Sequence, residues 1–264
     1  MKVYLIVLMA LLSACATQKP IVNTSGSATI TNGKLFASFF QQQAAEYKAL
    51  CFQAYNVAQY RLHAGLAQGG SKPKAIITDI DETVLDNSAY DIHQTLQGKD
   101  YEAQSWNEWT SRGEADTVPG APTFLKYAAS NGVRIFYITN RDEKERAGTL
   151  ANLKKFNLPD ADNEHLIMRQ SISSKEQRRQ EVMKTHDVVL LIGDNLADFS
   201  DLFDKKPMEE RNETTRRMAK EFGSRFIILP NPVYGDWETA LYQYNSRLTL
   251  AQKDSILRAS VKSY

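Results

Sequence analysis

Two carboxylates separated by a single residue, Asp79 and Asp81, form the pair in this sequence whose spacing could do chemistry. They follow a short apolar run at residues 75–77, which is typical of a buried parallel strand. Open α/β sheets bind ligands just beyond the carboxyl ends of such strands. There, one carboxylate can attack an electrophile, a Mg2+ ion can screen the charge, and the second carboxylate can move a proton. The alternative is an acidic turn that caps the next helix, with Thr83 as its N-cap.

Further polar side chains follow other apolar segments that predict strands. These segments are residues 133–141, 165–168, 188–193 and 226–229. Thr139 and Asn140 lie at the end of the first segment, and Lys175 follows the second at the start of a predicted helix. Asp194 and Asp198 directly follow the third. Mg2+ prefers a few carboxylates, several waters and a substrate phosphate, and this set of residues offers such a site.

Five stretches of the chain together resemble one known family. They are D-I-D-E-T-x-L-D-N at residues 79–87, an apolar strand ending in Thr139, S-S-K-E-x-R-R at 173–179, G-D-N-x-x-D-F at 193–199 and P-N-x-x-Y-G-x-W-E at 230–238. Their content and order resemble the motifs of the haloacid dehalogenase (HAD) superfamily. The form is similar to that of the class C bacterial acid phosphatases, also called the 5'-nucleotidase, lipoprotein e family. The resemblance covers nearly the whole chain after its N-terminal segment.

The resemblance implies a Mg2+-dependent acid phosphomonoesterase that works through an aspartyl-phosphate. Asp79 would be the nucleophile, and Asp81 would protonate the leaving group and then deprotonate the attacking water. Mg2+ would be bound by the side chains of Asp79 and Asp194 and by the backbone carbonyl of Asp81. Asp198 would support the site near the metal or near Lys175.

The resemblance also implies how a small phosphomonoester would bind. Thr139, Asn140 and Lys175 would neutralise the phosphoryl oxygens, and Tyr234 would stack on the base of the substrate. Members of this family hydrolyse 5'-nucleotides, nicotinamide mononucleotide and aryl phosphates, and the sequence does not choose among these substrates.

Two alternatives to a phosphatase stay open. A phosphotransferase of the same fold would share every motif and would differ in using an acceptor other than water. A non-enzymatic surface lipoprotein could bind a ligand through His93, His165 or His186, although these histidines lack metal-ligand spacing.

The N-terminal residues predict a lipoprotein signal peptide at residues 1–14. Lys2 supplies a positive charge and an apolar run follows, which is too short to span a bilayer. The stretch before Cys15 resembles a bacterial lipobox, so Cys15 would carry the acyl chains of an anchor in the bacterial outer membrane, facing the periplasm or the surface. The alternative is an ordinary secretory signal that happens to end in cysteine. Residues 15–34 then predict a flexible tether.

The fold predicted for residues 35–264 is α/β, a HAD-like Rossmannoid core with a parallel sheet flanked by helices. A smaller, mainly helical cap would combine the N-terminal helical pattern over residues 35–65, read as one long helix or two, with an insertion at about residues 88–118. Trp106 and Trp109 in this insertion would share one helical face. They would either stack on a nucleobase or pack within the cap.

The composition of the chain restricts the kinds of ligand and the covalent cross-links that we expect. The net charge of +1 argues against a nucleic-acid polymer as ligand, while a homodimer stays open. With Cys15 lipidated, Cys51 has no internal disulfide partner and is predicted to be a buried core thiol. Arg178 and Arg179 are predicted to face solvent or to form ion pairs.

Overall fold

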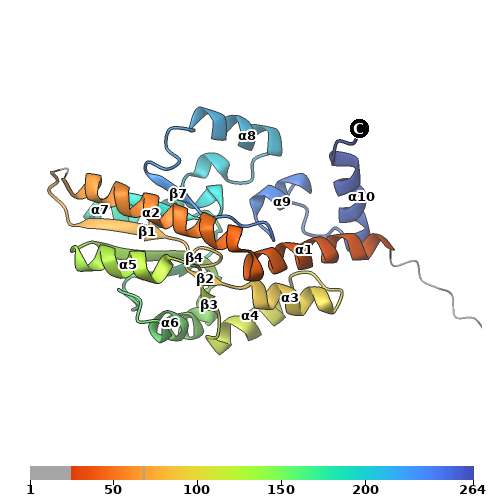
Figure 1. Ribbon diagram of the computed structural model, residues 1–264, viewed down its shortest axis with the longest axis horizontal. Coiled ribbons are helices and arrows are strands. Elements are labelled where there is room, and N and C mark those ends of the chain that lie inside the picture. The colour runs from red at the N-terminus through yellow and green to blue at the C-terminus, as the bar shows by residue number, and fades with distance from the viewer. Residues whose placement is uncertain (1–24, 68) are drawn as a thin grey trace, which may run out of the picture.

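The computed structural model describes residues 25–67 and 69–264, and its centre is a five-stranded parallel sheet in the order β5-β4-β1-β6-β7 (Figure 1). The strands are β1 (Lys74–Thr78), β4 (Arg134–Asp142), β5 (Leu166–Arg169), β6 (Asp187–Gly193) and β7 (Phe226–Ile228). This confirms the predicted α/β core. The predicted signal peptide, the lipidation at Cys15 and the tether up to residue 24 lie outside the described residues.

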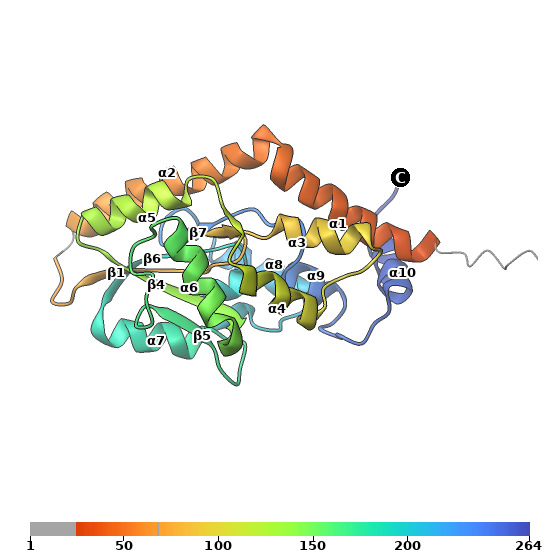
Figure 2. The same cartoon turned by 90° about the horizontal axis from the view of Figure 1, so that it is seen from below.

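Both faces of the sheet are covered, which explains why its strands are continuous apolar runs. Alternate residues of β1 point to opposite faces, so that Ile76 joins one core and Ile77 joins the other. Helices α2 (Ala45–Ala67) and α5 (Ala121–Ser130) cover the first face, and α7 (Glu176–Thr185) covers the second (Figure 2). β1 lies at the centre, between β4 and β6, so its carboxyl end is flanked by the ends of two neighbours.

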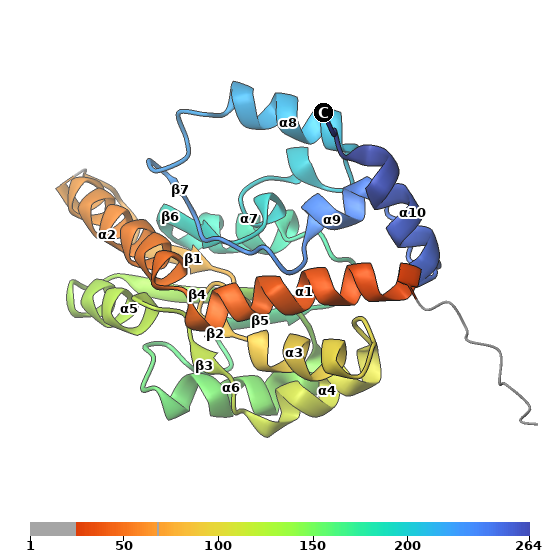
Figure 3. The same cartoon turned by 45° about the vertical axis from the view of Figure 1, so that its right-hand side comes forward.

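A helical layer lies beyond the carboxyl ends of the strands. It consists of α1 (Ser25–Gln43), α3 (Ser88–Leu96) and α4 (Ala103–Arg112), with α10 (Leu250–Ser260) beside α1 (Figure 3). The short antiparallel pair β2 (Leu85–Asp86) and β3 (Asp116–Thr117) joins this layer to the sheet.

The N-terminal helical pattern forms two helices, α1 and α2, which are separated at Ala44. α1 begins at Ser25, so residues 25–34, which the sequence assigned to the tether, are helical instead. Their Ser, Thr, Asn and Gly residues are weak helix formers, but Ile30 is buried and α1 packs against α3 and α10. Tertiary packing overrides local propensity here.

The remaining elements surround the sheet and its loops. They are α6 (Arg146–Lys155), α8 (Met208–Arg217), α9 (Asp236–Leu241) and the short 3-10 helices η1 (Glu143–Glu145), η2 (Leu196–Asp198) and η3 (Asp201–Phe203). Across residues 25–67 and 69–264, none of the helices has both the length and the apolar character needed to cross a bilayer.

Cys51 is fully buried in the core beneath α2, as predicted, and it is not in a disulfide. Burial raises the pKa of its thiol to about 11, so it is a packing residue rather than a reactive thiolate.

Candidate active site

Polar residues from several strand ends meet beyond the carboxyl end of β1. Asp79 follows β1 directly, and its backbone N–H donates to Ile192 O of β6 at 2.8 Å. Asp194 and Asp198 follow β6, and one oxygen from each of these two residues and one from Asp79 all lie within 4.8 Å of one another. The predicted carboxylates are therefore brought together.

Lys175 places an ammonium group inside this acidic cluster. Its Nζ forms ion pairs with Asp79 and, at 2.6 Å, with Asp198. Lys175 occupies the N-cap position of α7, while Ser174 Oγ accepts from the N–H of Glu176 at 3.4 Å. Burial alone would lower the pKa of Lys175, but Asp198 and Asp79 outweigh it and raise the pKa, so the side chain stays charged.

The cluster carries more negative than positive charge. Burial, reinforced by Asp198 and Asp81 and opposed by Lys175, raises the pKa of Asp79 to about 7. Burial, with Asp198 and Asp79 nearby, also holds the pKa of Asp194 well above its usual range. A divalent cation would supply the missing positive charge, and an all-oxygen donor set suits Mg2+. The residues present therefore fit such an ion.

Two carboxylates of the cluster are held from outside it. Asn231 Nδ2 donates to Asp194 Oδ2 at 2.8 Å, and Thr83 Oγ1 donates to Asp194 Oδ1 at 3.3 Å. Asp198 Oδ2 accepts from the N–H of Asn195 at 3.0 Å. Asp194 accepts these bonds from neutral groups, whereas the other oxygen of Asp198 pairs with Lys175, so Asp194 is the better candidate metal ligand of the two.

Gly193 makes the position of Asp198 possible. A Cβ atom at residue 193 would lie 2.5 Å from Asp198 Cβ, closer than real Cβ atoms approach. The glycine at the end of β6 is therefore required for space, and any larger side chain would displace the carboxylate that pairs with Lys175.

Asp81 is held by Arg141, which the motif analysis did not single out, and by Asn87, the last residue of the first motif. Arg141 donates to its carboxylate from Nη2 at 2.8 Å and from Nε at 3.0 Å, and Asn87 Nδ2 donates at 2.9 Å. Thr139 Oγ1 donates weakly to Asp81 Oδ2 at 3.4 Å, and it accepts from the N–H of Arg141 at 3.1 Å. The sequence feature that could have identified Arg141 is its position directly after Thr139 and Asn140, at the end of an apolar strand.

The prediction that Arg178 and Arg179 face solvent or form ion pairs is confirmed only for the ion pair of Arg179 with Glu176, and neither arginine is fully exposed. Arg178 donates to Thr139 O at 2.6 Å and to Asn140 Oδ1 at 2.7 Å, so it fixes the end of β4. Arg179 is only 1% exposed, donates to Asp198 O at 2.9 Å and pairs with Glu176. The spacing of these arginines from Lys175, three and four residues, marks the inner face of α7, and this spacing could have placed them correctly.

Glu82 is a second residue that the sequence analysis missed. It is fully buried and has a φ of 57°, which is rare for a residue other than glycine. Its carboxylate accepts from Tyr234 Oη at 3.1 Å, from the N–H of Asn87 at 3.2 Å and from Gln41 of α1. Burial raises the pKa values of Glu82 and Tyr234. The structure thus places Tyr234 beside the first motif, held by its hydroxyl group.

The two tryptophans of α4 contact the residues around Asp81. Trp109 Nε1 donates to Asn87 Oδ1 at 2.9 Å, and the guanidinium of Arg141 lies 5.7 Å from the centre of the Trp106 ring. Trp106 also meets Tyr90 edge to face, with ring centres 5.0 Å apart. Packing within the cap therefore accounts for part of this aromatic set.

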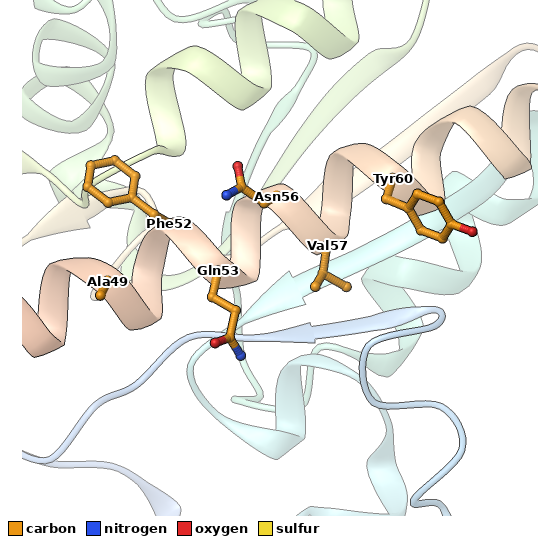
Figure 4. A pocket seen from close by; sticks show the side chains of 6 residues that line it. All are labelled: Ala49, Phe52, Gln53, Asn56, Val57 and Tyr60. Atoms are coloured by element: carbon orange, nitrogen blue, oxygen red, sulfur yellow. The ribbon is translucent and has the colours of Figure 1, made fainter.

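Two other features of the described residues do not resemble a phosphoryl site. A shallow hollow of about 540 Å³ on the outer side of α2 is lined by apolar and uncharged polar side chains (Figure 4). They are Ala49, Phe52, Gln53, Asn56, Val57 and Tyr60. A second group of possible ligands, Asp160, Asp162 and His165, already has protein partners, since Arg134 contacts both Asp160 and His165.

Two solved structures are similar to this chain in fold. The class C acid phosphatase from Bacillus anthracis superposes with a TM-score of 0.86 at 44% sequence identity, over 89% of this chain and 99% of that chain. The same enzyme with tungstate bound gives a TM-score of 0.85 at 43% identity, over 89% of this chain and 98% of that chain.

More distant relatives occur in plants. The Stem 31 kDa glycoprotein of Glycine max is 28% identical over 60% of this chain, and Acid phosphatase 1 of Solanum lycopersicum is 24% identical over 60%. The matched part spans 58% and 57% of these two relatives. The model of HAD superfamily subfamily IIIB (acid phosphatase) matches residues 8–237. This chain belongs to subfamily IIIB of the HAD superfamily, the acid phosphatases.

Proposed function

We propose that this protein is a Mg2+-dependent acid phosphomonoesterase that works through an aspartyl-phosphate. The observation that carries the proposal is the meeting of the buried Asp79 and Asp198 and the half-buried Asp194 around Lys175, beyond the central strand of the sheet. Such a cluster concentrates a nucleophile, candidate metal ligands and a cation at one point. When bound, Mg2+ would be held by the side chains of Asp79 and Asp194 and by the carbonyl of Asp81, and would polarise the phosphoryl group.

The residues of the chain account for both chemical steps. A carboxylate oxygen of Asp79 attacks phosphorus, the ester P–O bond breaks, and Asp81 gives its proton to the leaving oxygen. Water then attacks the phosphorus of the aspartyl-phosphate, the bond to Asp79 breaks, and Asp81 takes the proton from the water. Thr139, Asn140 and Lys175 would hold the phosphoryl oxygens, Lys175 contributing the positive charge.

We further propose that the substrates are 5'-nucleotides, nicotinamide mononucleotide among them. Support comes from the aromatic side chains near the first motif. Tyr234 is tied to Glu82, and Tyr101 is 60% exposed at 6.1 Å from Trp106, ring centre to ring centre. A nucleobase could stack on exposed rings of this kind.

The location of the protein is a separate proposal, based on sequence. Cys15 would carry the lipid anchor of an outer-membrane lipoprotein. We also propose, as a separate point, that the protein forms a homodimer. Labelling of cells with radioactive palmitate should mark the wild type and not Cys15→Ser. Light scattering of the purified enzyme would measure its mass, and a monomer would contradict the dimer.

Activity is tested with purified protein that lacks the signal peptide. Phosphate release from 5'-nucleotides, nicotinamide mononucleotide and p-nitrophenyl phosphate should require Mg2+, stop on addition of EDTA and be strongest on the acidic side of neutrality. Asp79→Asn should lose essentially all turnover while keeping the fold, because an amide does not attack phosphorus. Asp201→Asn, an exposed residue in η3, is the matched control. Turnover at the wild-type level in Asp79→Asn would contradict the assignment, and transfer to an alcohol instead of water would indicate a phosphotransferase.

A further inference from the structure

We propose that Arg141 is the positioning residue for the proton-transfer carboxylate Asp81, and that the cap contributes to this positioning through Trp109 and Asn87. The inference rests on the proposed function, because it concerns the residue that moves the proton there. It adds an arginine and a cap residue, neither of which is part of the metal cluster.

The contact between Arg141 and Asp81 fixes the plane of the carboxylate. Arg141 reaches Asp81 Oδ1 from Nη2 at 2.8 Å and from Nε at 3.0 Å, and Nε also lies 3.3 Å from Oδ2. Two donors on one rigid guanidinium define an orientation, whereas a lysine would supply only a point charge. Thr139 Oγ1, 3.4 Å from Asp81 Oδ2, places the same carboxylate beside the residue expected to hold the phosphoryl group.

Arg141 is itself held rigidly. Its guanidinium is almost completely buried, and Nη1 donates to Thr149 Oγ1 of α6 at 3.0 Å. The Thr149 hydroxyl in turn donates to Glu145 O at 2.8 Å. The guanidinium carbon of Arg141 also lies 5.7 Å from the centre of the Trp106 ring. A buried, fully supported arginine suits the placing of another group better than the capture of a mobile ligand.

The cap contributes a second interaction that positions Asp81, through a hydrogen bond from Asn87. Asn87 Nδ2 donates to Asp81 Oδ1 at 2.9 Å, and Asn87 Oδ1 accepts from Trp109 Nε1 at 2.9 Å. The indole N–H can only donate, so it fixes which end of the Asn87 amide faces Asp81. A helix of the cap therefore determines a hydrogen bond to the proton-transfer residue.

The positioning of Asp81 should determine how strongly the reaction rate depends on the leaving group. Asp81 must deliver its proton to the ester oxygen as the P–O bond breaks. An alkoxide leaves poorly without that proton, whereas p-nitrophenolate leaves readily. Loss of correct positioning should therefore slow the cleavage of alkyl phosphates much more than that of p-nitrophenyl phosphate. A residue that only bound the phosphoryl group, or only stabilised the fold, would affect both substrates by the same factor.

The test compares Arg141→Gln and Arg141→Lys with the wild type on adenosine 5'-monophosphate and p-nitrophenyl phosphate, both with Mg2+. The measured quantity is kcat/KM, which reports phosphoryl transfer to Asp79 and excludes the later hydrolysis step. We expect a loss of about 100-fold or more on the nucleotide, in the range of general acid catalysis, and a loss of less than about 10-fold on the aryl ester. Arg134→Gln, at the other end of β4, is the control and should leave both values unchanged.

A second variant keeps the inference testable if Arg141 variants fold poorly by circular dichroism. Trp109→Phe keeps an aromatic ring and removes the N–H that donates to Asn87, and it should show the same preference for the aryl ester with a loss of about 10-fold on the nucleotide. Equal losses on both substrates in the folded variants would overturn the inference. A wild type that releases no phosphate from either ester would instead overturn the proposed function, and this inference with it, so the two failures are distinguishable.

Discussion

At the scale of single residues, Lys175 decides the charge of the site. Its ammonium contacts Asp79 and Asp198, and Asp194 lies in the same cluster. Buried like charges repel strongly, since the interior screens them less than water does. The lysine therefore balances part of the charge that a metal ion would otherwise balance alone.

Lys175→Met should separate catalysis from metal binding. We expect kcat to fall by about 100-fold or more, the usual result of removing one charge-stabilising donor. We expect Mg2+ to bind at least as tightly as in the wild type, because the carboxylates then form a more negative site. Phosphate release and calorimetric titration with Mg2+ measure the two effects. Lys184→Met, an exposed lysine on the same helix, should change neither, and weaker Mg2+ binding in Lys175→Met would contradict this account.

The sequence predicts the residues of the site better than it predicts their supports. Asp79, Asp194 and Lys175 follow apolar strands in motifs that can be recognised locally, and the structure brings them together. Arg141 and Glu82 escaped notice because their importance depends on partners from distant segments, which periodicity does not reveal. Glu82, for example, contacts Gln41 of α1 and Tyr234 of the loop between β7 and α9.

At the scale of elements, the close approach of α4 and α6 sets the position of the cap. A Cβ atom at Gly148 of α6 would collide with the backbone of α4, at Thr110 O and, at 2.8 Å, Ser111 Cα. α4 carries Trp106 and Trp109, which contact Arg141 and Asn87. The absence of a side chain at residue 148 thus lets the cap reach the residues around Asp81.

Gly148→Ala should push α4 outward. We expect a destabilisation of about 1–3 kcal/mol, the usual cost of overpacking, and a loss of activity larger than this destabilisation alone explains. Gly33→Ala in α1 is the matched control, because its Cβ would meet nothing within 4 Å. That change should raise stability by up to about 1 kcal/mol. Thermal unfolding and phosphate release measure both variants, and full activity in Gly148→Ala would show that the position of α4 does not matter.

The elements themselves could be predicted where their pattern is local. The strands are continuous apolar runs, and alternate side chains of β1 enter opposite cores, because both faces of the parallel sheet are buried. The start of α1 at Ser25 could not be predicted, because its first residues are typical of a linker. They are helical because α1 packs against α3 and against α10, more than 200 residues later in the chain.

At the scale of the whole molecule, one buried charge network joins segments that are far apart in the sequence. Lys34 of α1 pairs with Asp100 at 2.8 Å and with Glu238 of α9 at 3.1 Å. Lys253 of α10 pairs with Asp100 at 2.6 Å. Burial would raise the pKa of Asp100, but Lys34 and the hydrogen bonds from Lys253 and Lys34 outweigh it and lower the pKa to about 2. This network fastens the C-terminal helices to the cap.

Asp91 of α3 interacts electrostatically with the charges of that network but is incompletely paired. Its Oδ2 is buried and finds no hydrogen-bond partner among the described residues. Burial raises the pKa of Asp91 to about 7; Lys34 opposes the rise, and Asp100, Asp86 and Glu238 add to it. The unfolded value is about 4. Between these values the folded protein keeps a proton that the unfolded chain releases, so Asp91 lowers stability as pH rises from about 4 to about 7.

Asp91→Asn should therefore remove a dependence of stability on pH. The amide does not titrate, so the stability difference between the variant and the wild type should shift in favour of the variant by about 1 kcal/mol per pH unit between pH 4 and 7. Below pH 4 the difference should be constant, because Asp91 is then protonated in both states. Denaturant unfolding at several pH values measures it, and other titrating groups cancel because both proteins contain them. Asp201→Asn should show no such shift. A constant difference from pH 4 to 7 would mean that Asp91 is already ionised in the fold, with Lys34 as a full partner.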